Sequence, residues 1–121
     1  MPSGLVTIQN YQKNVLAVIT KDRLTDAGSI NAVAEDLDFE LEKFPKISLI
    51  IDCSAIAAMS SLMLGKLVAL HKKVKKGKGR MCLTGIDKKL MPLFTVTKLH
   101  KVFDFADDAQ QVLLLYQRKP L

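Results

Sequence analysis

The residues best placed for chemistry are two adjacent serines, Ser60 and Ser61, where a loop leads into a helix predicted over 61–76. The loop follows an apolar run, 47–51, which Asp52 closes. Backbone N–H groups point out of the start of a helix, and the helix dipole favours negative charge there. A phosphoserine would be held at this place without unfolding the helix and would add nearly two negative charges. A serine here can equally be a structural N-cap with no further function.

No other set of side chains has the spacing of a catalytic or metal site. No acidic residue is spaced to orient the ring of His71 or His100, so we expect both at the surface or partly buried. Cys53 and Cys82 are too few and too far apart for a zinc site or a CxxC pair, and we expect buried thiols in a reducing compartment. The turn GKG at 77–79 lacks the pattern of a phosphate loop. We therefore expect no enzyme, no metal and no cofactor.

Basic residues are concentrated in the second half of the chain. The net charge is +6, of which residues 1–60 carry −3 and residues 61–121 carry +9. The basic run consists of Lys66, Lys72, Lys73, Lys75, Lys76, Lys78 and Arg80. Such a run can bind nucleic acid or an acidic protein, but it has no interleaved aromatic residues and no DNA-binding motif. We expect a solvated helix face and do not expect nucleic acid as a partner.

Length and composition indicate a globular protein. The chain has 121 residues, of which 49% are hydrophobic, 25% charged and only 6% aromatic. This composition excludes a disordered chain and predicts an aliphatic core. No stretch approaches the ~20 apolar residues that cross a bilayer, and the first residues do not resemble a signal peptide. We expect a single cytoplasmic domain over 1–121 with no membrane partner.

The elements that must position the serines are strands and helices in alternation. Five apolar runs predict strands, at residues 5–9, 15–19, 47–51, 80–84 and 102–103. Four helices are predicted, over 27–43 with Asp26 as N-cap, over 61–76, from Asp87 onward, and after Asp107 as N-cap. The segment NYQKN is expected as a turn and TKDRLTD as a polar loop. This order predicts an α/β fold, with a mixed four- to five-stranded sheet and helices packed mainly on one face.

The order of elements and the residues around the serines resemble the STAS domain of bacterial anti-sigma factor antagonists. The resemblance is carried by SLIIDCSAIAAMSSLMLGKLVALHKKVKKGKGRMCLTGI and TKLHKVFDFADDA, and VLAVITKDRLTD fits the same order earlier in the chain. The family motif has an Asp before its two serines and a Gly after them, where this chain has Met59 and Leu62. The resemblance implies a STAS-like fold over nearly the whole chain.

The resemblance also implies a function in partner switching. In that family the unphosphorylated antagonist binds an anti-sigma factor that is also a serine kinase. Phosphorylation of the antagonist breaks the complex, and a serine phosphatase restores it. The family's phosphorylated serine directly follows the motif Asp, which places it at Ser60, with Ser61 as second choice. The partner-binding residues expected on this basis are Asp22, Thr25, Asp26, Ser54, Met59, Ser61, Leu62, Met63 and Lys66.

Two interpretations stay open at this stage. The missing motif Asp favours a STAS scaffold or ligand-binding module that does not switch and works within a signalling assembly. Leu62 either packs against a neighbouring loop or contacts a partner, because single exposed apolar residues are ordinary.

Overall fold

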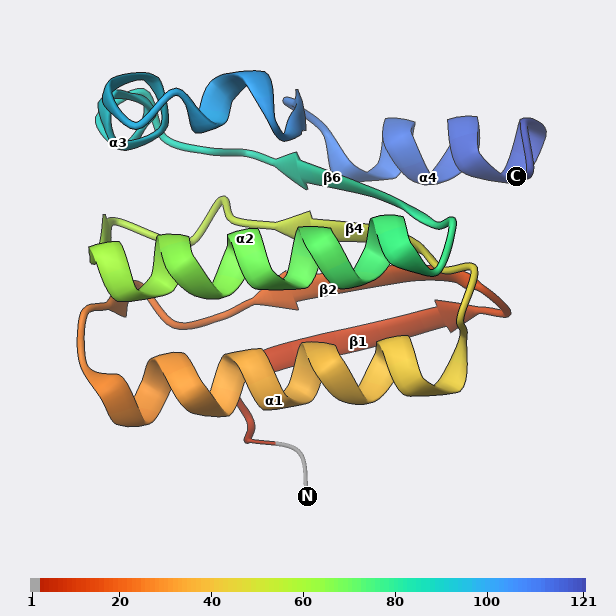
Figure 1. The fold of residues 1–121 in the computed structure, drawn as a ribbon, viewed down its shortest axis with the longest axis horizontal. Coiled ribbons are helices and arrows are strands. Elements are labelled where there is room, and N and C mark those ends of the chain that lie inside the picture. The colour runs from red at the N-terminus through yellow and green to blue at the C-terminus, as the bar shows by residue number, and fades with distance from the viewer. Residues whose placement is uncertain (1–2) are drawn as a thin grey trace.

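The computed structural model describes residues 3–121 and builds them around a five-stranded sheet (Figure 1). In chain order the elements are β1 (Val6–Tyr11), β2 (Asn14–Ile19), β3 (Arg23–Leu24), α1 (Ala27–Lys43), β4 (Ser48–Asp52), β5 (Ala58–Met59), α2 (Ser61–Lys76), β6 (Arg80–Thr84), α3 (Met91–Val96), the 3-10 turn η1 (Leu99–Lys101), β7 (Asp104–Ala106) and α4 (Ala109–Arg118). The strand order is β1-β2-β4-β6-β7. Only β1 and β2 pair antiparallel in this sheet. The predicted mixed sheet is therefore confirmed.

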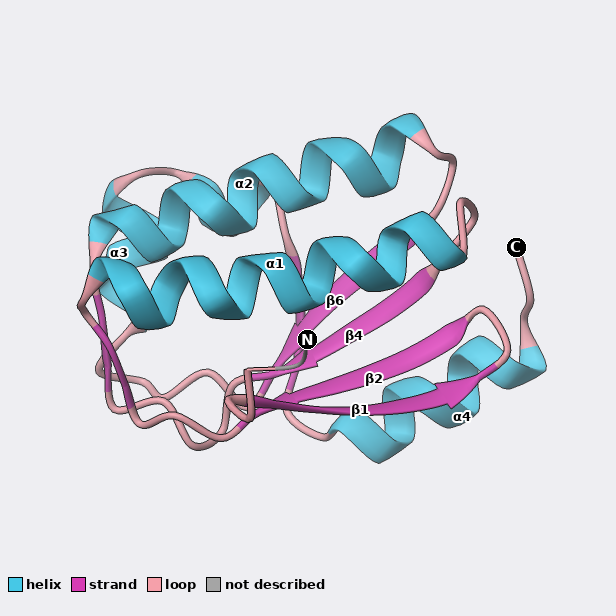
Figure 2. Ribbon diagram, turned by 90° about the horizontal axis from the view of Figure 1, so that it is seen from below, coloured by secondary structure: helices cyan, strands magenta, loops and turns pink. Residues whose placement is uncertain are grey.

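The helices lie on both faces of the sheet, with most of them on one. Figure 2 shows α1 and α2 on one side of the strands and α4 on the other. The larger core joins the sheet to residues of α1, α2 and α3, including Ile30, Leu67 and Phe94. The smaller core packs α4 onto the opposite face, with Leu113 and Tyr116 at its centre. The expectation of helices mainly on one face is confirmed.

Strand β4 is buried on both faces, which explains its continuous apolar run. Leu49, Ile50 and Ile51 are each 0% exposed. Because side chains alternate along a strand, Leu49 and Ile51 enter the larger core and Ile50 enters the smaller one. A strand that is buried on both faces does not need to alternate apolar and polar residues.

The last two helices begin at other residues than the sequence predicted. Asp87 does not begin a helix: its Oδ1 accepts the N–H of Lys89 at 2.8 Å and closes a turn. The helix α3 begins instead at Met91, and Pro92 lies in its first turn, where a missing N–H costs no helical hydrogen bond. At the last helix, Asp108 rather than Asp107 is the N-cap and accepts from the N–H of Gln110.

The final strand lies two residues later than predicted. Lys98 has a left-handed backbone, with φ of 61°, and starts the 3-10 turn that runs up to Val102. Phe103 is 4% exposed, and its ring meets that of Phe94 edge to face at 6.0 Å. Phe103 therefore fills the core, whereas Val102 is 42% exposed, and pairing with β6 begins only at Asp104.

The first hairpin is tighter than the segment NYQKN suggests. Tyr11 pairs with Asn14, so that only Gln12 and Lys13 form the turn. Gln12 takes the positive φ of 57° that such two-residue turns require.

Arg80 fastens α4 to the sheet. Its Nε donates to Oγ of the buried Ser48 at 2.8 Å, and its Nη2 donates to the C=O of Tyr116 at 3.0 Å. The guanidinium also lies 4.0 Å from the centroid of the Tyr116 ring. Burial raises the pKa of the Tyr116 phenol. A single side chain thus ties two strands to the last turns of α4.

We expect Arg80→Ala to lower the free energy of unfolding by about 2 kcal/mol, because it removes two charge-assisted hydrogen bonds and a cation–π contact. Urea denaturation measures the loss. The control is Arg118→Ala, at the exposed end of the same helix, which should cost less than about 0.5 kcal/mol. Equal losses in the two variants would show that Arg80 does not fasten α4.

Candidate functional site

Ser60 lies at the junction of two short parallel strands and a long helix. Strands β3 and β5 pair in parallel, with Arg23 opposite Ala58 and Leu24 opposite Met59. The backbone N–H of Ser60 continues this ladder and donates to the C=O of Leu24 at 3.0 Å. This two-stranded sheet was not predicted, because the sequence analysis expected a polar loop before Asp26. It joins the start of α2 to the segment that leads into α1.

The Ser60 hydroxyl makes no hydrogen bond within residues 3–121, although its oxygen is buried. Ser60 holds the N-cap position of α2, with φ of −92° and ψ of 168°, but its side chain does not cap the helix. Turning the hydroxyl toward solvent therefore breaks no hydrogen bond. The first turn of α2 contains no acidic residue, so a negative group at Ser60 would meet the helix N–H groups with no carboxylate of that turn beside it.

The segment before α1 lies beside Ser60. The C=O of Asp22 accepts from the N–H groups of Ala57 and Ala58, at 2.6 and 3.2 Å, and the side chains of Asp22 and Thr25 are exposed. Asp26 is the N-cap of α1, as predicted, and its Oδ2 accepts the N–H of Ser29 at 2.8 Å. This hydrogen bond holds the pKa of the Asp26 carboxyl below its ordinary value of 3.8.

On α2 the expected partner-binding residues divide between surface and core. Ser61 is exposed and Leu62 is 44% exposed, which leaves nearly half of one apolar residue open to solvent beside Ser60. Met59 is 7% exposed and Met63 is 1% exposed, so both belong to the core and offer no surface to a partner. Met59 lies opposite the buried Leu24 in the β3–β5 pair. We therefore omit both methionines from the proposed contact surface.

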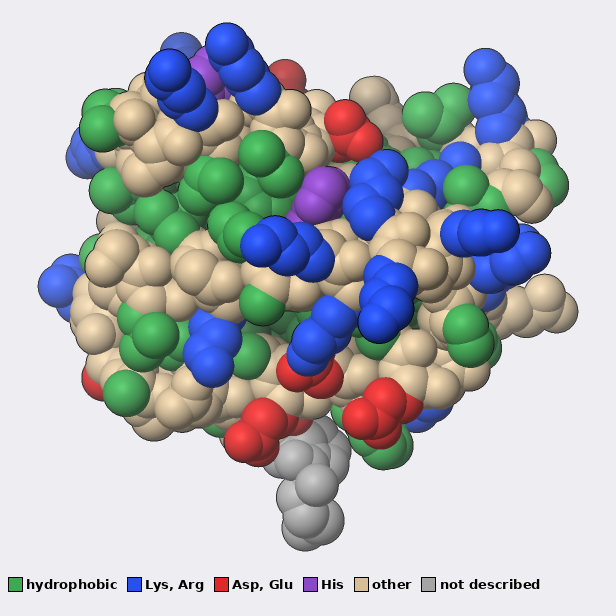
Figure 3. All heavy atoms as spheres, viewed as in Figure 1, with side chains coloured by type: hydrophobic (Ala, Val, Ile, Leu, Met, Phe, Trp, Pro, Cys, Tyr) green, Lys and Arg blue, Asp and Glu red, His purple; other side chains and the backbone are tan. Residues whose placement is uncertain are grey.

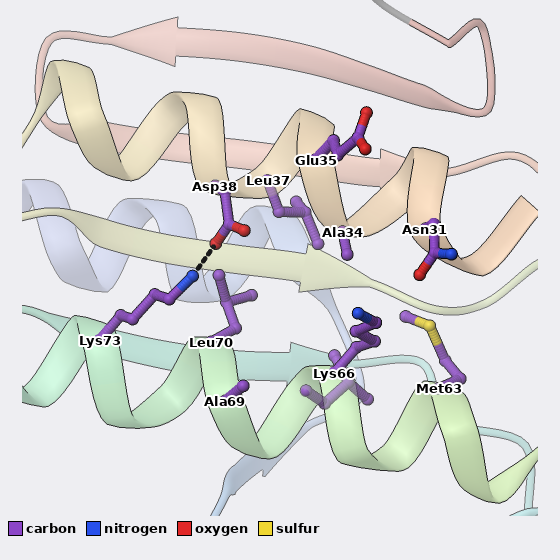
Figure 4. Close-up of a pocket in the computed structure, with 11 residues that line it drawn as sticks. Asn31, Ala34, Glu35, Leu37, Asp38, Met63, Lys66, Ala69, Leu70 and Lys73 are labelled. Atoms are coloured by element: carbon purple, nitrogen blue, oxygen red, sulfur yellow. Dashed lines mark hydrogen bonds and ion pairs between the residues drawn. The ribbon is translucent and has the colours of Figure 1, made fainter. Parts of the chain in front are cut away.

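Lys66 lines a groove between α1 and α2 of about 360 Å³. Figure 4 shows Lys66 and Met63 toward one end of this groove and the ion pair between Lys73 and Asp38 toward the other. The Nζ of Lys73 is 3.1 Å from Oδ1 of Asp38. The groove therefore starts close to Ser60 and is crossed by an ion pair at its far end.

Ser54 belongs to a different cluster, at the carboxyl ends of β4 and β6. Its hydroxyl donates to Oδ2 of Asp52 at 2.7 Å, and the hydroxyl of Thr84 donates to Oδ1 at 2.9 Å. Gly85 has φ of +69°, and a Cβ there would lie 2.8 Å from that of Ser54. The structure therefore does not bring Ser54 into hydrogen-bond contact with the Ser60 junction. The sequence offered one sign of this cluster, an Asp that closes an apolar strand.

The remaining candidates lie apart from Ser60. Both cysteines are free and buried, as predicted, and burial raises the pKa of Cys82 to about 11. His71 is partly buried and meets Phe103 edge to face at 5.4 Å, and burial lowers its pKa. Within residues 3–121 no group of three or more His, Cys, Asp or Glu side chains could hold a metal ion. In the same range, no helix combines the length and the apolar character that crossing a membrane requires.

The basic run lies on the face that α2 forms. Figure 3 shows lysine side chains spread over this face, beside a hydrophobic area and above a few acidic groups. Lys72, Lys75 and Lys76 are exposed, and no hydrogen bond or ion pair holds them within the described chain. This is the arrangement of a solvated helix face.

Comparison with known proteins identifies the family to which this architecture corresponds. The model of the STAS domain matches residues 7–112, which confirms the resemblance drawn from the sequence. No curated protein matches the chain significantly in sequence.

Solved structures share the fold at low sequence identity. An anti-sigma-factor antagonist (STAS) domain protein from Planctomyces limnophilus is 16% identical, covers 91% of this chain and 95% of its own, and has a TM-score of 0.79. An anti-sigma factor antagonist from Mycobacterium paratuberculosis is 18% identical over 93% of this chain and 92% of its own, with a TM-score of 0.77. The Bacillus cell fate determinant SpoIIAA, solved in its phosphorylated form, is 12% identical over 88% of this chain and 96% of its own, with a TM-score of 0.67.

The cap of α1 gives a pH-dependent prediction. Because the folded state holds the Asp26 carboxyl below 3.8, its carboxylate stabilises the fold above that pH. The stability advantage of the wild type over Asp26→Ala should therefore be complete at neutral pH and disappear as pH falls through the lowered pKa. Urea midpoints across this range measure it. Asp22→Ala is the control, since the exposed Asp22 carboxylate makes no hydrogen bond in residues 3–121. A pH-independent difference would contradict the assigned cap.

Proposed function

This chain belongs to the STAS domain family, and we propose that it is an anti-sigma factor antagonist controlled by phosphorylation of Ser60. The observation that carries the proposal is the Ser60 hydroxyl, which makes no hydrogen bond within residues 3–121 and lies at the N-cap of α2. The similar structures support it, because they include anti-sigma factor antagonists and a phosphorylated member. The chain acts as the substrate and binding partner of an enzyme and is not itself an enzyme.

The unphosphorylated surface around Ser60 is proposed to bind an anti-sigma serine kinase in the cytoplasm. Leu62 supplies the exposed apolar contact, and polar side chains surround it on α2 and on the segment before α1. The polar residues proposed for this surface are Asp22, Thr25, Asp26, Ser61 and Lys66. Ser54 is proposed as a weaker contact of this surface, because its hydroxyl already donates a hydrogen bond to Asp52.

Phosphoryl transfer would use ATP held by the kinase. The Ser60 oxygen, turned toward solvent, attacks the γ-phosphorus of ATP, the bond from phosphorus to ADP breaks, and a base of the kinase accepts the hydroxyl proton. A serine phosphatase reverses the modification by hydrolysis, releasing inorganic phosphate. This chain contributes the nucleophilic oxygen and a helix start that tolerates the product.

Phosphorylation would separate the complex by charge and desolvation. The free fold tolerates the phosphate, because the N–H groups of the α2 start and the helix dipole favour an anion. Inside an interface the same group must lose its water, which costs several kcal/mol unless the partner compensates. A loss of about 3 kcal/mol weakens binding roughly 150-fold. One covalent change is therefore enough to switch the partner off.

One observation favours a second candidate function, a scaffold that does not switch. Met59 stands where the family motif has Asp, and its side chain is buried against Leu24 rather than presented beside Ser60. A kinase that requires that carboxylate would not recognise this site. The chain would then bind its partner constitutively within a signalling assembly.

We expect protein purified from its native cells to carry one phosphate, located at Ser60 by peptide mass spectrometry. Ser60→Ala should abolish the added mass, and the matched variant Ser61→Ala should retain it, because Ser61 is the exposed neighbour outside the N-cap position. Absence of phosphate under all growth conditions would contradict switching and favour the scaffold. A phosphate that moves with Ser61 would reassign the modified residue.

The proposed surface can be tested separately from the modification. Asp26→Lys combined with Leu62→Glu should reduce binding of the co-purifying kinase at least about tenfold, because a charge is reversed and an apolar contact is lost. The control, Leu114→Glu, changes a side chain that is 54% exposed on α4 and should bind as the wild type does. Unchanged binding of the double variant in calorimetry would remove this surface from the proposal.

A further inference from the structure

The two edges of the sheet are protected very differently. Strand β7 at one edge has three residues and starts with the exposed Asp104. Strand β1 at the other edge has six residues, VTIQNY, with no charged residue and no proline, and it pairs with β2 without a bulge. Proteins usually protect exposed edges with short strands, charges, prolines or bulges. Because β1 has none of these, its open edge is suited to pairing with another strand.

The backbone groups that β1 leaves open belong to alternate residues. The C=O of Leu5 accepts the N–H of Thr20 at 2.9 Å, so the bonds to β2 fall at Leu5 and every second residue after it. The N–H and C=O groups of Val6, Ile8 and Asn10 therefore point away from β2. Within residues 3–121 nothing bonds to this edge.

A groove of about 500 Å³ runs between β1 and α1 above this edge. Ser3 donates to Asp36 at 3.0 Å and Asn10 donates to Glu40 at 2.7 Å, so β1 and α1 run in the same direction. Figure 1 shows the two elements side by side along one margin of the molecule. Phe39, which is 58% exposed, lines this groove.

On the outer side of α1, Phe39 stands between an acidic residue and a basic one. Glu35, Phe39 and Lys43 follow one another at a spacing of four, which places them along one side of the helix. All three line the groove beside β1, together with Asp36 and Glu40. The Nζ of Lys43 is 3.1 Å from Oε2 of Glu40 and 4.8 Å from the centroid of the Phe39 ring, and the Lys43 side chain is 42% exposed. A second α1 in the opposite direction would place its Lys43 near Glu35 and its Phe39 near Phe39.

We propose that a second copy of this chain covers the edge, with β1 pairing antiparallel to β1 of the other copy and α1 packing against α1. A two-fold axis through the middle of β1 reverses both elements at once, because they run in the same direction. The pairing joins the two sheets into one of ten strands, and the helix contact buries Phe39 with complementary charges at its flanks. A parallel arrangement would place like charges together. The dimer does not depend on phosphorylation of Ser60.

The association is measured by sedimentation equilibrium of the full chain over a concentration series. We expect a species of twice 13.4 kDa, and Phe39→Asp should raise its dissociation constant at least about tenfold. Leu114→Asp is the matched control, since its side chain is 54% exposed on α4, and it should leave the constant unchanged. A chain that is monomeric at every concentration overturns the proposal, as does a dimer that responds to Leu114→Asp and not to Phe39→Asp.

Hydrogen exchange of the wild type tests the strand pairing without any substitution. The amides of Val6, Ile8 and Asn10 should exchange more slowly as concentration rises, because they become hydrogen-bonded across the two-fold axis. The amide of Asp104 at the opposite edge is the internal control and should not respond. Dimerisation without slower exchange at β1 would overturn the proposed interface. The charge pattern is checked by Glu35→Lys, which should weaken the dimer because it places a lysine near Lys43 of the other copy. Lys43 itself is left unchanged, because its Nζ pairs with Glu40 within each copy.

Discussion

The burial of β4 on both faces is the constraint on which the rest of the architecture depends. A strand whose side chains all enter a core must have neighbours on both edges and helices on both sides, which parallel pairing with β2 and β6 and the two layers of helices provide. Parallel pairing also makes the loops after β2 and β4 leave from the same end of the sheet. Those loops carry β3 and β5, and their pairing positions Ser60. The site is therefore a consequence of how the central strand is buried.

The sequence predicts those parts of the fold that repeat a pattern over many residues. The helices 27–43 and 61–76 have clear apolar periodicity, and their predicted ranges match α1 and α2. Strands β3 and β5 have two residues each, so no periodicity exists to reveal them, and only their pairing, Arg23 with Ala58 and Leu24 with Met59, defines them. Two helix starts in the last third of the chain were also predicted at the wrong residue. Asp87 and Asp107 are plausible caps by residue type, but Asp87 closes a turn and the neighbouring Asp108 caps the last helix.

For the site around Ser60, the sequence shows which residues are present, but it does not show which side chains are buried and which are hydrogen-bonded. The serine pair at a helix start was visible in the sequence, but the lack of a hydrogen bond at the buried Ser60 hydroxyl within residues 3–121 was not. Likewise, Met63 fits the apolar stripe of α2 as well as the family's partner surface, and its 1% exposure decides for the core. Leu62, one residue earlier, has the same chemical character and points outward. One step around a helix, about 100°, separates a packing residue from a surface residue.

The uneven distribution of charge affects how fast a partner arrives as well as how tightly it binds. The outer face of α1 carries acidic residues and the solvent-facing side of α2 carries lysines, so charges of opposite sign lie on two neighbouring helices. A charged partner is turned by the field of these charges before contact, and encounters in the favourable orientation become more frequent. Salt screens this guidance within about 10 Å at 0.1 M ionic strength. The solvated lysines of α2 can thus change the rate at which a charged partner associates with the surface around Ser60, although they do not form part of that surface.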